Sequence, residues 1–309
     1  MVVFPHCKIN LGLRILGKRP DGFHDLETVF YPVYGLTDIL EIIPNTTLST
    51  NNFVCSGLPI QGDAANNLCL KAWHLLHADY PNLPPVNMHL HKVIPMGAGL
   101  GGGSSDGMFA LQLLNIKLRL QLDRQQLLGY AAKLGSDCAF FSHKKPCLGS
   151  GRGEILQPIE LDLSPYQLVL IHPGIHVNTA WAFSALVGVA MARVPTEHQN
   201  HPDGMVRIPT DHQNHPDAMV RVSTNHQKPI TQIIQQPIAT WRAELHNDFE
   251  LPVFEAHPEI ADIKAQLYQQ QALYAAMSGS GSTVFGIFPK EQTPQLEFPS
   301  HYFIRTLPL

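Results

Sequence analysis

Charge and long apolar runs are what this sequence has little of. Only 15% of its 309 residues are charged and the formal net charge is −4, so no basic stripe is present. Nucleic acids and anionic membranes attract such stripes, and we expect neither as a partner. No run of about 18 apolar residues could form a membrane-spanning helix. Residues 1–8 also lack the apolar stretch of a signal peptide. We therefore expect a soluble, cytoplasmic protein.

Cysteine is also scarce and forms no CxxC pair. The five cysteines are Cys7, Cys55, Cys69, Cys138 and Cys147. In a chain of this length they are typical of reduced core residues, which excludes a disulfide framework and a zinc site. Hydrophobic residues, in contrast, make up 44% of the chain, which is a globular balance. The length allows two domains of ordinary size, each with its own core.

Apolar periodicity places strands and helices along the chain. Over residues 4–15 apolar and polar side chains alternate, which predicts a strand with one buried face and with Lys8 and Asn10 on the polar face. Turn residues follow at 19–22. We expect further strands at residues 37–43, 86–91 and 167–171, and helices at 67–77, 108–118 and 124–134, the last ending at Gly135. The mixture indicates an α+β or α/β first domain at 1–162 and a second domain at 163–309.

Residues 193–227 repeat with a period of 14 residues, and the third copy is truncated. The unit is polar, rich in proline and shorter than the repeats of solenoid proteins. We interpret it as a flexible tandem insert in a surface loop of the second domain. Its paired histidines are His198 with His201 and His212 with His215. Without a cysteine or an ordering scaffold nearby, we expect them to bind no metal.

The strongest functional signal is a glycine-rich segment at residues 95–105, between an expected strand and an expected helix. Its glycines are Gly97, Gly99, Gly101, Gly102 and Gly103. Glycine permits a positive φ and a close approach to a ligand. The N-terminus of the following helix attracts anions through its free N–H groups and its dipole. We therefore expect a phosphate-binding loop, and two hydroxyls at the head of the helix suit phosphate or Mg²⁺.

Three kinds of phosphate loop could contain such a segment. A Walker A loop is excluded because no Lys-Ser/Thr pair follows the last glycine. The spacing of Gly97, Gly99 and Gly102 matches a dinucleotide fingerprint, but no clear βαβ unit or acidic ribose-binding residue follows. This disfavours a nicotinamide oxidoreductase. A non-catalytic nucleotide-binding protein is the alternative from another class, although a pure binder needs neither Lys8 nor Asp137.

The form of the loop instead resembles the phosphate loop of the GHMP kinases, the superfamily of galactose, homoserine, mevalonate and related kinases. Further segments resemble one branch of that superfamily in the same order along the chain: 4–11, 19–28, 134–141, 151–156, 172–174, 247–250 and 277–281. The branch comprises the 4-diphosphocytidyl-2-C-methyl-D-erythritol kinases of the non-mevalonate (methylerythritol phosphate) isoprenoid pathway. Residues 21–24 disfavour the homoserine and mevalonate branches. Phe23 departs from the branch, where tyrosine is common at this position.

The resemblance implies a two-domain α+β kinase that phosphorylates the 2-hydroxyl of the branch's substrate with ATP, in the cleft between its domains. Asp137 is then the base or orienting acceptor for the substrate hydroxyl, and Lys8 pairs with it and with the transferring phosphoryl group. Taken alone, Asp137 is typical of a turn or a helix cap, and Lys8 of a solvated strand face. The implied substrate-binding residues are Asn10, Phe23, His24 and Phe183, of which His24 hydrogen-bonds cytosine and the two rings stack on it.

The resemblance also implies where ATP and Mg²⁺ bind. The implied ATP-binding residues are Pro95, Gly97, Ala98, Gly99, Leu100, Gly101, Gly102, Gly103, Ser104 and Ser105. Ser105 is the candidate Mg²⁺ ligand. A loop of the second domain, with Gly279, Ser280 and Gly281, is expected to approach from the other side. We expect a monomer or a weak homodimer that acts on a small molecule.

Overall fold

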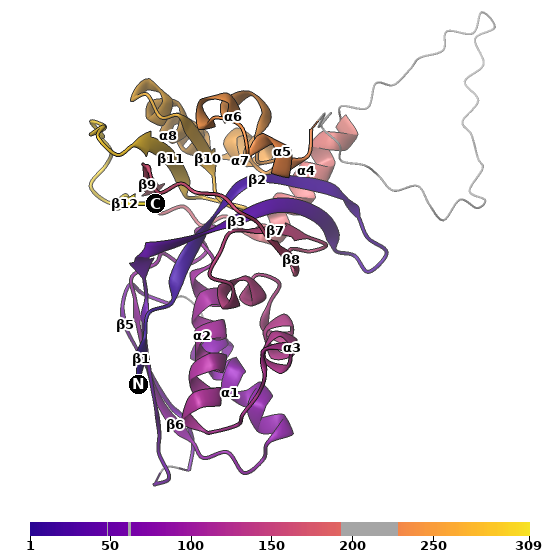
Figure 1. The fold of residues 1–309 in the computed structure, drawn as a ribbon, viewed down its shortest axis with the longest axis vertical. Coiled ribbons are helices and arrows are strands. Elements are labelled where there is room, and N and C mark those ends of the chain that lie inside the picture. Colours follow the sequence, from indigo (N-terminus) through magenta and orange to yellow (C-terminus); the bar gives the residue numbers. More distant parts are fainter. Residues whose placement is uncertain (48, 61–62, 193–227) are drawn as a thin grey trace, which may run out of the picture.

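The computed structural model describes residues 1–47, 49–60, 63–192 and 228–309, so the 14-residue repeats and their histidines lie outside the described residues. Within these ranges the chain forms three four-stranded sheets with helices packed on the two outer ones (Figure 1). The three sheets have the strand orders β1-β4-β6-β5, β2-β3-β7-β8 and β10-β11-β9-β12. The predicted α+β class is confirmed.

The sheet between the two outer ones is built on a long antiparallel hairpin. Its strands are β2 (His6–Lys18), β3 (His24–Thr37), β7 (Cys147–Ser150) and β8 (Ile155–Pro158). The predicted first strand and its turn are confirmed, because the N–H of Arg19 donates to the carbonyl of Phe23 at 2.7 Å. The expectation of one buried face is wrong, since Lys8 is 3% and Asn10 2% exposed. The polar face is covered by the glycine-rich loop and by the loop after β10.

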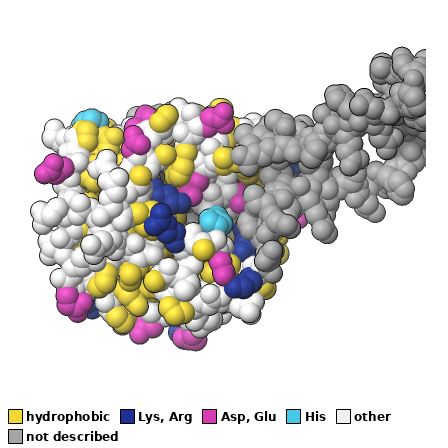
Figure 2. Space-filling model, turned by 90° about the horizontal axis from the view of Figure 1, so that it is seen from above, with side chains coloured by type: hydrophobic (Ala, Val, Ile, Leu, Met, Phe, Trp, Pro, Cys, Tyr) yellow, Lys and Arg dark blue, Asp and Glu magenta, His cyan; other side chains and the backbone are white. Residues whose placement is uncertain are grey.

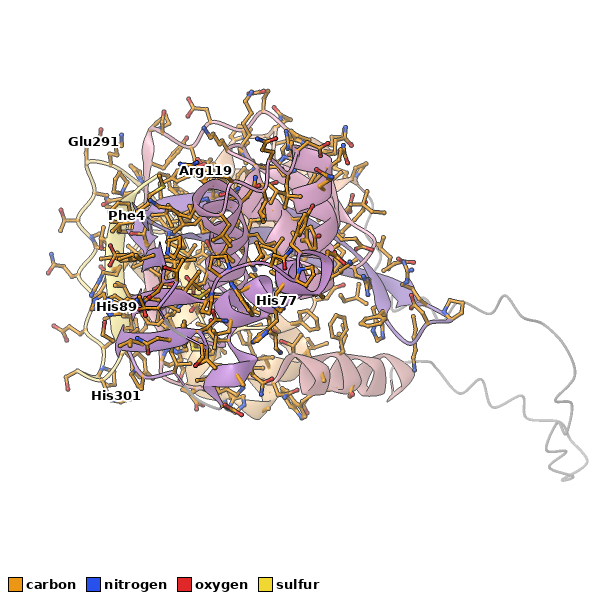
Figure 3. The ribbon with its side chains drawn as sticks, turned by 90° about the horizontal axis from the view of Figure 1, so that it is seen from below. Phe4, His77, His89, Arg119, Glu291 and His301 are labelled. Atoms are coloured by element: carbon orange, nitrogen blue, oxygen red, sulfur yellow. The ribbon has the colours of Figure 1, made fainter. Side chains whose placement is uncertain are left out.

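The sheet nearest the N-terminus carries its helices on one face. Its strands are β1 (Val2–Val3), β4 (Ile39–Pro44), β5 (Asn52–Gly57) and β6 (Val86–Lys92); the helices are η1 (Ala64–Asn66), α1 (Leu68–Asp79), α2 (Gly102–Lys117) and α3 (Arg124–Leu134), followed by η2 (Cys138–Ser142). The alternation in β6 buries Met88 and Leu90 under the helices and leaves His89 exposed on the outer face (Figure 3). The predicted helices are confirmed to within a few residues, except that the helix predicted at 108–118 begins at Gly102, six residues before its predicted start.

The third sheet and its helices come from the rest of the chain. The strands are β9 (Tyr166–His172), β10 (Tyr274–Met277), β11 (Val284–Pro289) and β12 (Phe303–Pro308); the helices are α4 (Thr179–Ala192), α5 (Ile230–Ile233), α6 (Ile238–Glu244), α7 (Glu250–Ala256) and α8 (Pro258–Gln269). All pairs in this sheet are antiparallel. The strands predicted at 37–43 and 167–171 are β4 and β9, whereas β1, β3, β5, β7, β8, β10 and β12 were not predicted.

The hydrophobic core is continuous across the middle of the molecule. One cluster joins Ile9 and Val29 of the long hairpin to Leu170, Trp241 and Phe285 of the second half. Two further clusters lie under the first sheet and within the second half. Each half therefore has a core and shares another with its neighbour. This shared packing holds β2 at a constant position between the two halves.

The surface agrees with the charge balance of the sequence. On the face seen in Figure 2, acidic and basic side chains are scattered among other residues, with no large patch of one sign. Among the described residues, no helix combines the length and apolarity needed to cross a membrane. All five cysteines are free; four are buried as predicted, whereas Cys55 is exposed.

Candidate active site

A cavity of about 1390 Å³ opens along β2, between the first sheet with its helices and the second half. Its walls come from β2 and β3, the glycine-rich loop, the residues around 137, the turn at 152, residues 176–184 and the loop at 279–280. Pockets for one small ligand usually measure about 300–1,000 Å³. This cavity is therefore large enough for two substrates side by side.

The glycine-rich loop needs its glycines chiefly for contacts within the protein. Gly99 and Gly101 have φ of 77° and 70°, and Gly101 is the N-cap of α2. A Cβ on Gly99 would overlap the Ser278 carbonyl oxygen, and one on Gly101 would stand 2.9 Å from the Phe141 ring. A Cβ on Gly103 would meet nothing within 4 Å. Gly103 lines the cavity, so the first turn of α2 presents bare backbone to it.

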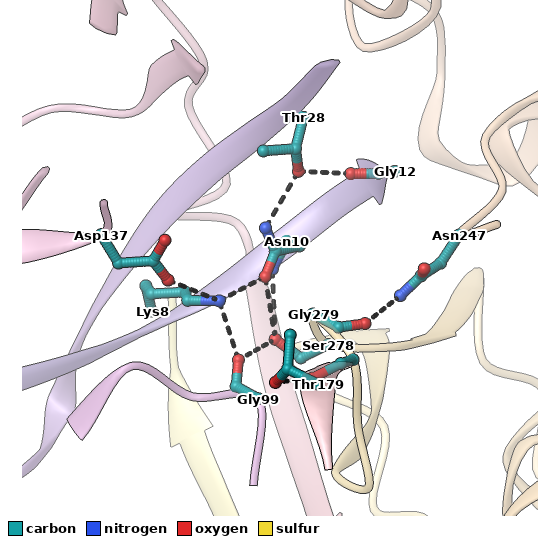
Figure 4. A network of polar contacts seen from close by, with 11 residues as sticks. Lys8, Asn10, Gly12, Thr28, Gly99, Asp137, Thr179, Asn247, Ser278 and Gly279 are labelled. Carbon is teal, nitrogen blue, oxygen red and sulfur yellow. Dashed lines mark hydrogen bonds and ion pairs between the residues drawn. The ribbon is translucent and has the colours of Figure 1, made fainter. Parts of the chain in front are cut away.

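The predicted pair of Lys8 and Asp137 meets in the cavity (Figure 4). Lys8 Nζ lies 3.7 Å from Asp137 Oδ2 and donates to Asn10 Oδ1 at 2.5 Å and to the Gly99 carbonyl at 2.9 Å. Burial lowers the pKa of Lys8, and the charge of Asp137 opposes that shift. Since the Lys8 side chain is only 4% exposed, the alternative of a solvated strand lysine is wrong.

Asp137 stands at the N-cap position of η2 but makes no capping hydrogen bond with its side chain. The alternative of a helix cap is therefore wrong, and the carboxylate is available to a ligand. Its side chain is 34% exposed and lines the cavity. A carboxylate in this position can accept a proton from a hydroxyl, and the Lys8 ammonium beside it can contact a transferred phosphoryl group.

Two hydroxyls hold the partners of Lys8. Asn10 Nδ2 donates to Thr28 Oγ1 at 3.0 Å, and that hydroxyl donates to the Gly12 carbonyl. This chain fixes the Asn10 amide with its oxygen toward Lys8 (Figure 4). Ser278 Oγ donates to the Gly99 carbonyl at 2.9 Å and accepts from the Asn10 N–H at 3.3 Å. The hydroxyl of Ser278 therefore joins β2, the glycine-rich loop and the second half at one point.

The opposite end of the cavity is lined by rings. His24 stacks on Phe183, with ring centroids 4.6 Å apart and an interplanar angle of 14°. Phe23 is 52% exposed and has the Arg152 guanidinium 4.7 Å from its ring centroid. His24 therefore covers one face of Phe183, and the Arg152 guanidinium covers one face of Phe23. Burial, together with the charge of Lys18, lowers the pKa of His24. The neutral imidazole has one donor and one acceptor nitrogen, and Nε2 has no partner among the described residues.

Most of the predicted site residues line the cavity, namely Lys8, Asn10, Phe23, His24, Pro95, Gly97, Ala98, Gly99, Gly101, Gly102, Gly103, Ser104, Asp137, Phe183, Gly279 and Ser280. Leu100, Ser105 and Gly281 do not. Leu100 points into the core and contributes its backbone carbonyl to the Lys8 N–H at 3.0 Å. Ser105 is fully buried on the inner side of α2, and its hydroxyl has no partner among the described residues.

Several residues in or directly behind the cavity were not predicted. Thr28, Ser278 and Arg152 each belong to a segment that carries the family resemblance, but none had a role assigned from the sequence. Lys92 donates to Asp38 and to Asp106 in a buried ion triad beside the first turn of α2. Burial raises the pKa of Asp106 to about 8, against the charge of Lys92. The signal in the sequence was that Lys92 continues the alternation of Val86, Met88 and Leu90 on the buried face of β6. A lysine in such a position needs partners, since lysine is rarely buried without them.

Comparison with known proteins gives the family. Residues 67–145 match the GHMP kinases N terminal domain and residues 230–297 match the GHMP kinases C terminal domain. The 4-diphosphocytidyl-2-C-methyl-D-erythritol kinase of Azobacteroides pseudotrichonymphae is 42% identical over 306 residues, which cover 98% of this chain and 100% of the relative.

Solved structures agree with this match. The crystal structure of a 4-(cytidine 5′-diphospho)-2C-methyl-D-erythritol kinase has a TM-score of 0.66 and 28% identity, over 93% of this chain and 89% of the other. A mevalonate kinase from Methanococcus jannaschii has a TM-score of 0.58 at 13% identity, over 94% and 92% of the two chains, and shows that the fold is shared more widely. The chain therefore belongs to the GHMP kinases and, within them, to the 4-diphosphocytidyl-2-C-methyl-D-erythritol kinase family.

Proposed function

We propose that this protein transfers the γ-phosphoryl group of ATP to the 2-hydroxyl of 4-diphosphocytidyl-2-C-methyl-D-erythritol, the compound named in its relatives. The observation that carries the proposal is the position of Asp137 beside Lys8, 3.7 Å apart, where the glycine-rich loop meets the loop at 279–280. The first turn of α2 offers backbone N–H groups for the phosphates of ATP on one side of this pair. The ring-lined end of the cavity lies on the other side and suits a cytosine.

In this arrangement the residues act mainly by positioning. Asp137 takes the proton of the substrate hydroxyl, and Lys8 stabilises the negative charge that spreads over the phosphoryl oxygens. The Lys8 ammonium must be held at a fixed position for this role, because phosphoryl transfer depends on the alignment of the reacting groups more than on covalent catalysis by the protein. The Asn10 side-chain oxygen and the Gly99 carbonyl hold it there by accepting its hydrogen bonds.

Magnesium is part of the proposal, bound together with the phosphates of ATP. Mg²⁺ prefers one or two protein oxygens and substrate phosphates over a dedicated protein cage. The absence of a cluster of three ligating side chains among the described residues fits that mode. Ser104 reaches the cavity and would hold the ion, whereas Ser105 is buried away from it. The ion would neutralise charge on the phosphates.

Three further expectations stay predictions. The division into domains at residues 162 and 163 is supported by the sheets, since the first two end at Pro158 and the third begins at Tyr166. The cytoplasmic location and the monomeric or weakly dimeric state rest on the sequence alone.

The experiment is an assay of ATP consumption coupled to ADP detection, with a panel of acceptors. The panel contains 4-diphosphocytidyl-2-C-methyl-D-erythritol, homoserine, mevalonate and galactose. We expect turnover with the first compound only, and a new phosphomonoester at its 2-position by ³¹P NMR. Comparable turnover of any other acceptor, or ATP binding without turnover of any of them, would contradict the proposal.

A further inference from the structure

Four cationic side chains line the cavity: Lys8, Lys18, Lys92 and Arg152. Two of them are already bound by groups inside the protein. Lys8 is held by Asn10, Gly99 and Asp137, and Lys92 is enclosed by two carboxylates. Lys18 is exposed near the end of β2. Arg152 is therefore the cation to consider first for a contact with an anionic part of the second substrate.

The turn at 151–154 sets Arg152 between the two ends of the cavity. The N–H of Leu26 donates to the Gly151 carbonyl at 2.7 Å, which ties the turn to β3. The guanidinium lies over the Phe23 ring, as given above. A Cβ on the next residue, Gly153, would stand 3.8 Å from Asp137 Oδ1. The turn that carries Arg152 thus lies beside the acceptor carboxylate, and the Arg152 side chain ends over the Phe23 ring.

The guanidinium keeps donors for a ligand in this position. Its Nε lies 3.5 Å from Glu154 Oε1, and its two Nη nitrogens donate to no group among the described residues. Stacking on a ring uses the face of the guanidinium and leaves the N–H groups of its edge exposed. Two parallel N–H groups match two phosphate oxygens, a geometry that lysine cannot offer.

We propose that Arg152 binds the diphosphate of the nucleotide substrate and so sets the distance between its base and its reacting hydroxyl. The inference rests on the proposed function, in which a cytidine lies at the rings and a hydroxyl lies at Asp137. The diphosphate that links these two parts must then pass the turn at 151–154. The phosphates of ATP do not compete for Arg152, because the first turn of α2 serves them on the other side of Asp137.

The test compares Arg152→Ala and Arg152→Lys with Arg305→Ala. Arg305 is a matched control, because its guanidinium also stacks on a ring, 4.5 Å from the Phe303 centroid, but it does not line the cavity. Arg152→Ala should raise KM for the nucleotide substrate by about tenfold or more, the usual loss for a hydrogen bond to a charged group. The KM for ATP should change by less than about twofold, and Arg152→Lys should recover only part of the loss because it keeps the charge without the fork.

Titration calorimetry with CDP and with cytidine separates a phosphate contact from support of Phe23. Arg152→Ala should weaken CDP by about tenfold and leave cytidine unchanged. Equal weakening of both, or unchanged affinity for CDP, would overturn the proposal. Failure of the unmodified protein to phosphorylate any acceptor would instead refute the proposed function, and the CDP titration would still decide the role of Arg152.

Discussion

The two ends of the cavity are built in opposite ways. Lys8 and Asn10 are hydrogen-bonded within the protein, and their partners come from β2, β3, the glycine-rich loop and the loop after β10. Around Phe23 and His24 the side chains stack on one another and the rings make few hydrogen bonds. The first end is fixed before any ligand arrives, whereas the second can rearrange around one.

This difference follows from what each end does. A group that stabilises a transient charge must already be in place, since reorganising it during the reaction would raise the barrier. A group that recognises a base gains from adapting to it. Substitutions at the first end should therefore lower kcat, and substitutions at the second should change KM and selectivity.

The largest effect is expected for Asp137→Asn. The amide keeps the shape of the side chain but cannot take a proton, so kcat should fall by about 10²–10⁴. The KM for ATP should hardly change, because the glycine-rich loop is untouched. Steady-state kinetics with both substrates provide the measurement.

Lys8→Met supplies the second half of that test. The Lys8→Met and Asp137→Asn double variant should be little worse than the poorer single variant, because the two groups act on the same step. If the losses in kcat of the two single variants multiplied in the double variant, or if Asp137→Asn kept normal turnover, the end of the cavity around Lys8 and Asp137 would not be the catalytic one.

Selectivity for cytosine should depend on the ring-lined end of the cavity, around Phe23 and His24. A neutral His24 can donate to and accept from a base, and a site with unpaired polar groups rejects the wrong base strongly. The uridine analogue of the substrate should react at least about 10²-fold less efficiently. His24→Ala should narrow that gap in kcat/KM and leave the KM for ATP intact. The comparison between the two ends would fail if both analogues were turned over equally by the unmodified protein.

A smaller effect on kcat is expected for Thr28→Val, which keeps the shape but removes the hydroxyl that orients Asn10. The Asn10 amide loses its hydrogen bond and can rotate, so Lys8 loses a fixed acceptor. We expect kcat to fall by about tenfold, the equivalent of one hydrogen bond to a charged group, with the KM for both substrates nearly unchanged. Thr28→Ser keeps the hydroxyl and should restore most of kcat. Equal losses in the two variants would assign Thr28 to packing alone.

Local patterns predicted much of this molecule, and contacts between distant segments account for what they missed. The strand at β2, the helix α3 and the glycine-rich loop follow from periodicity, turn residues and caps that lie within a few residues of each other. The burial of Lys8 could not be predicted in the same way, because its cover comes from residues 99 and 278.

The same distinction between local patterns and contacts of distant segments applies to the site residues. Lys8 and Asp137 were found through motifs, and the cavity unites them. Arg152 and Thr28 lie within such motifs, but their roles depend on neighbours that the sequence does not place beside them. Ser105 is the opposite case. A serine at the head of a helix after a glycine-rich loop was expected to bind Mg²⁺, but its side chain is buried.

The last effect concerns stability in acid and not turnover, and it tests the framework behind the cavity separately from the site itself. His172 lies at the end of β9, its Nδ1 is 3.1 Å from Ser282 Oγ, and burial, followed by the charge of His176, lowers its pKa to about 4. An unfolded chain binds this proton below a pH of about 6.5. The unfolded state therefore holds more protons between pH 6.5 and 4, and the folded protein should lose up to about 3 kcal/mol as the pH falls through that range.

His172→Asn isolates this contribution, because its amide can keep a hydrogen bond to Ser282 but does not titrate. The free energy of unfolding in urea should depend less on pH between 6.5 and 4 in His172→Asn than in the unmodified protein, whereas His301→Gln, at an exposed site (Figure 3), should leave the dependence unchanged. The difference between variants is the quantity to compare. Asp106, whose raised pKa of about 8 gives the opposite slope, contributes equally to all three proteins. If the free energy of unfolding depended on pH in the same way in His172→Asn and in the unmodified protein, protonation of His172 would not destabilise the fold. The structure around β9 would then adjust to a charged ring as readily as the rings around Phe23 are expected to adjust to a ligand.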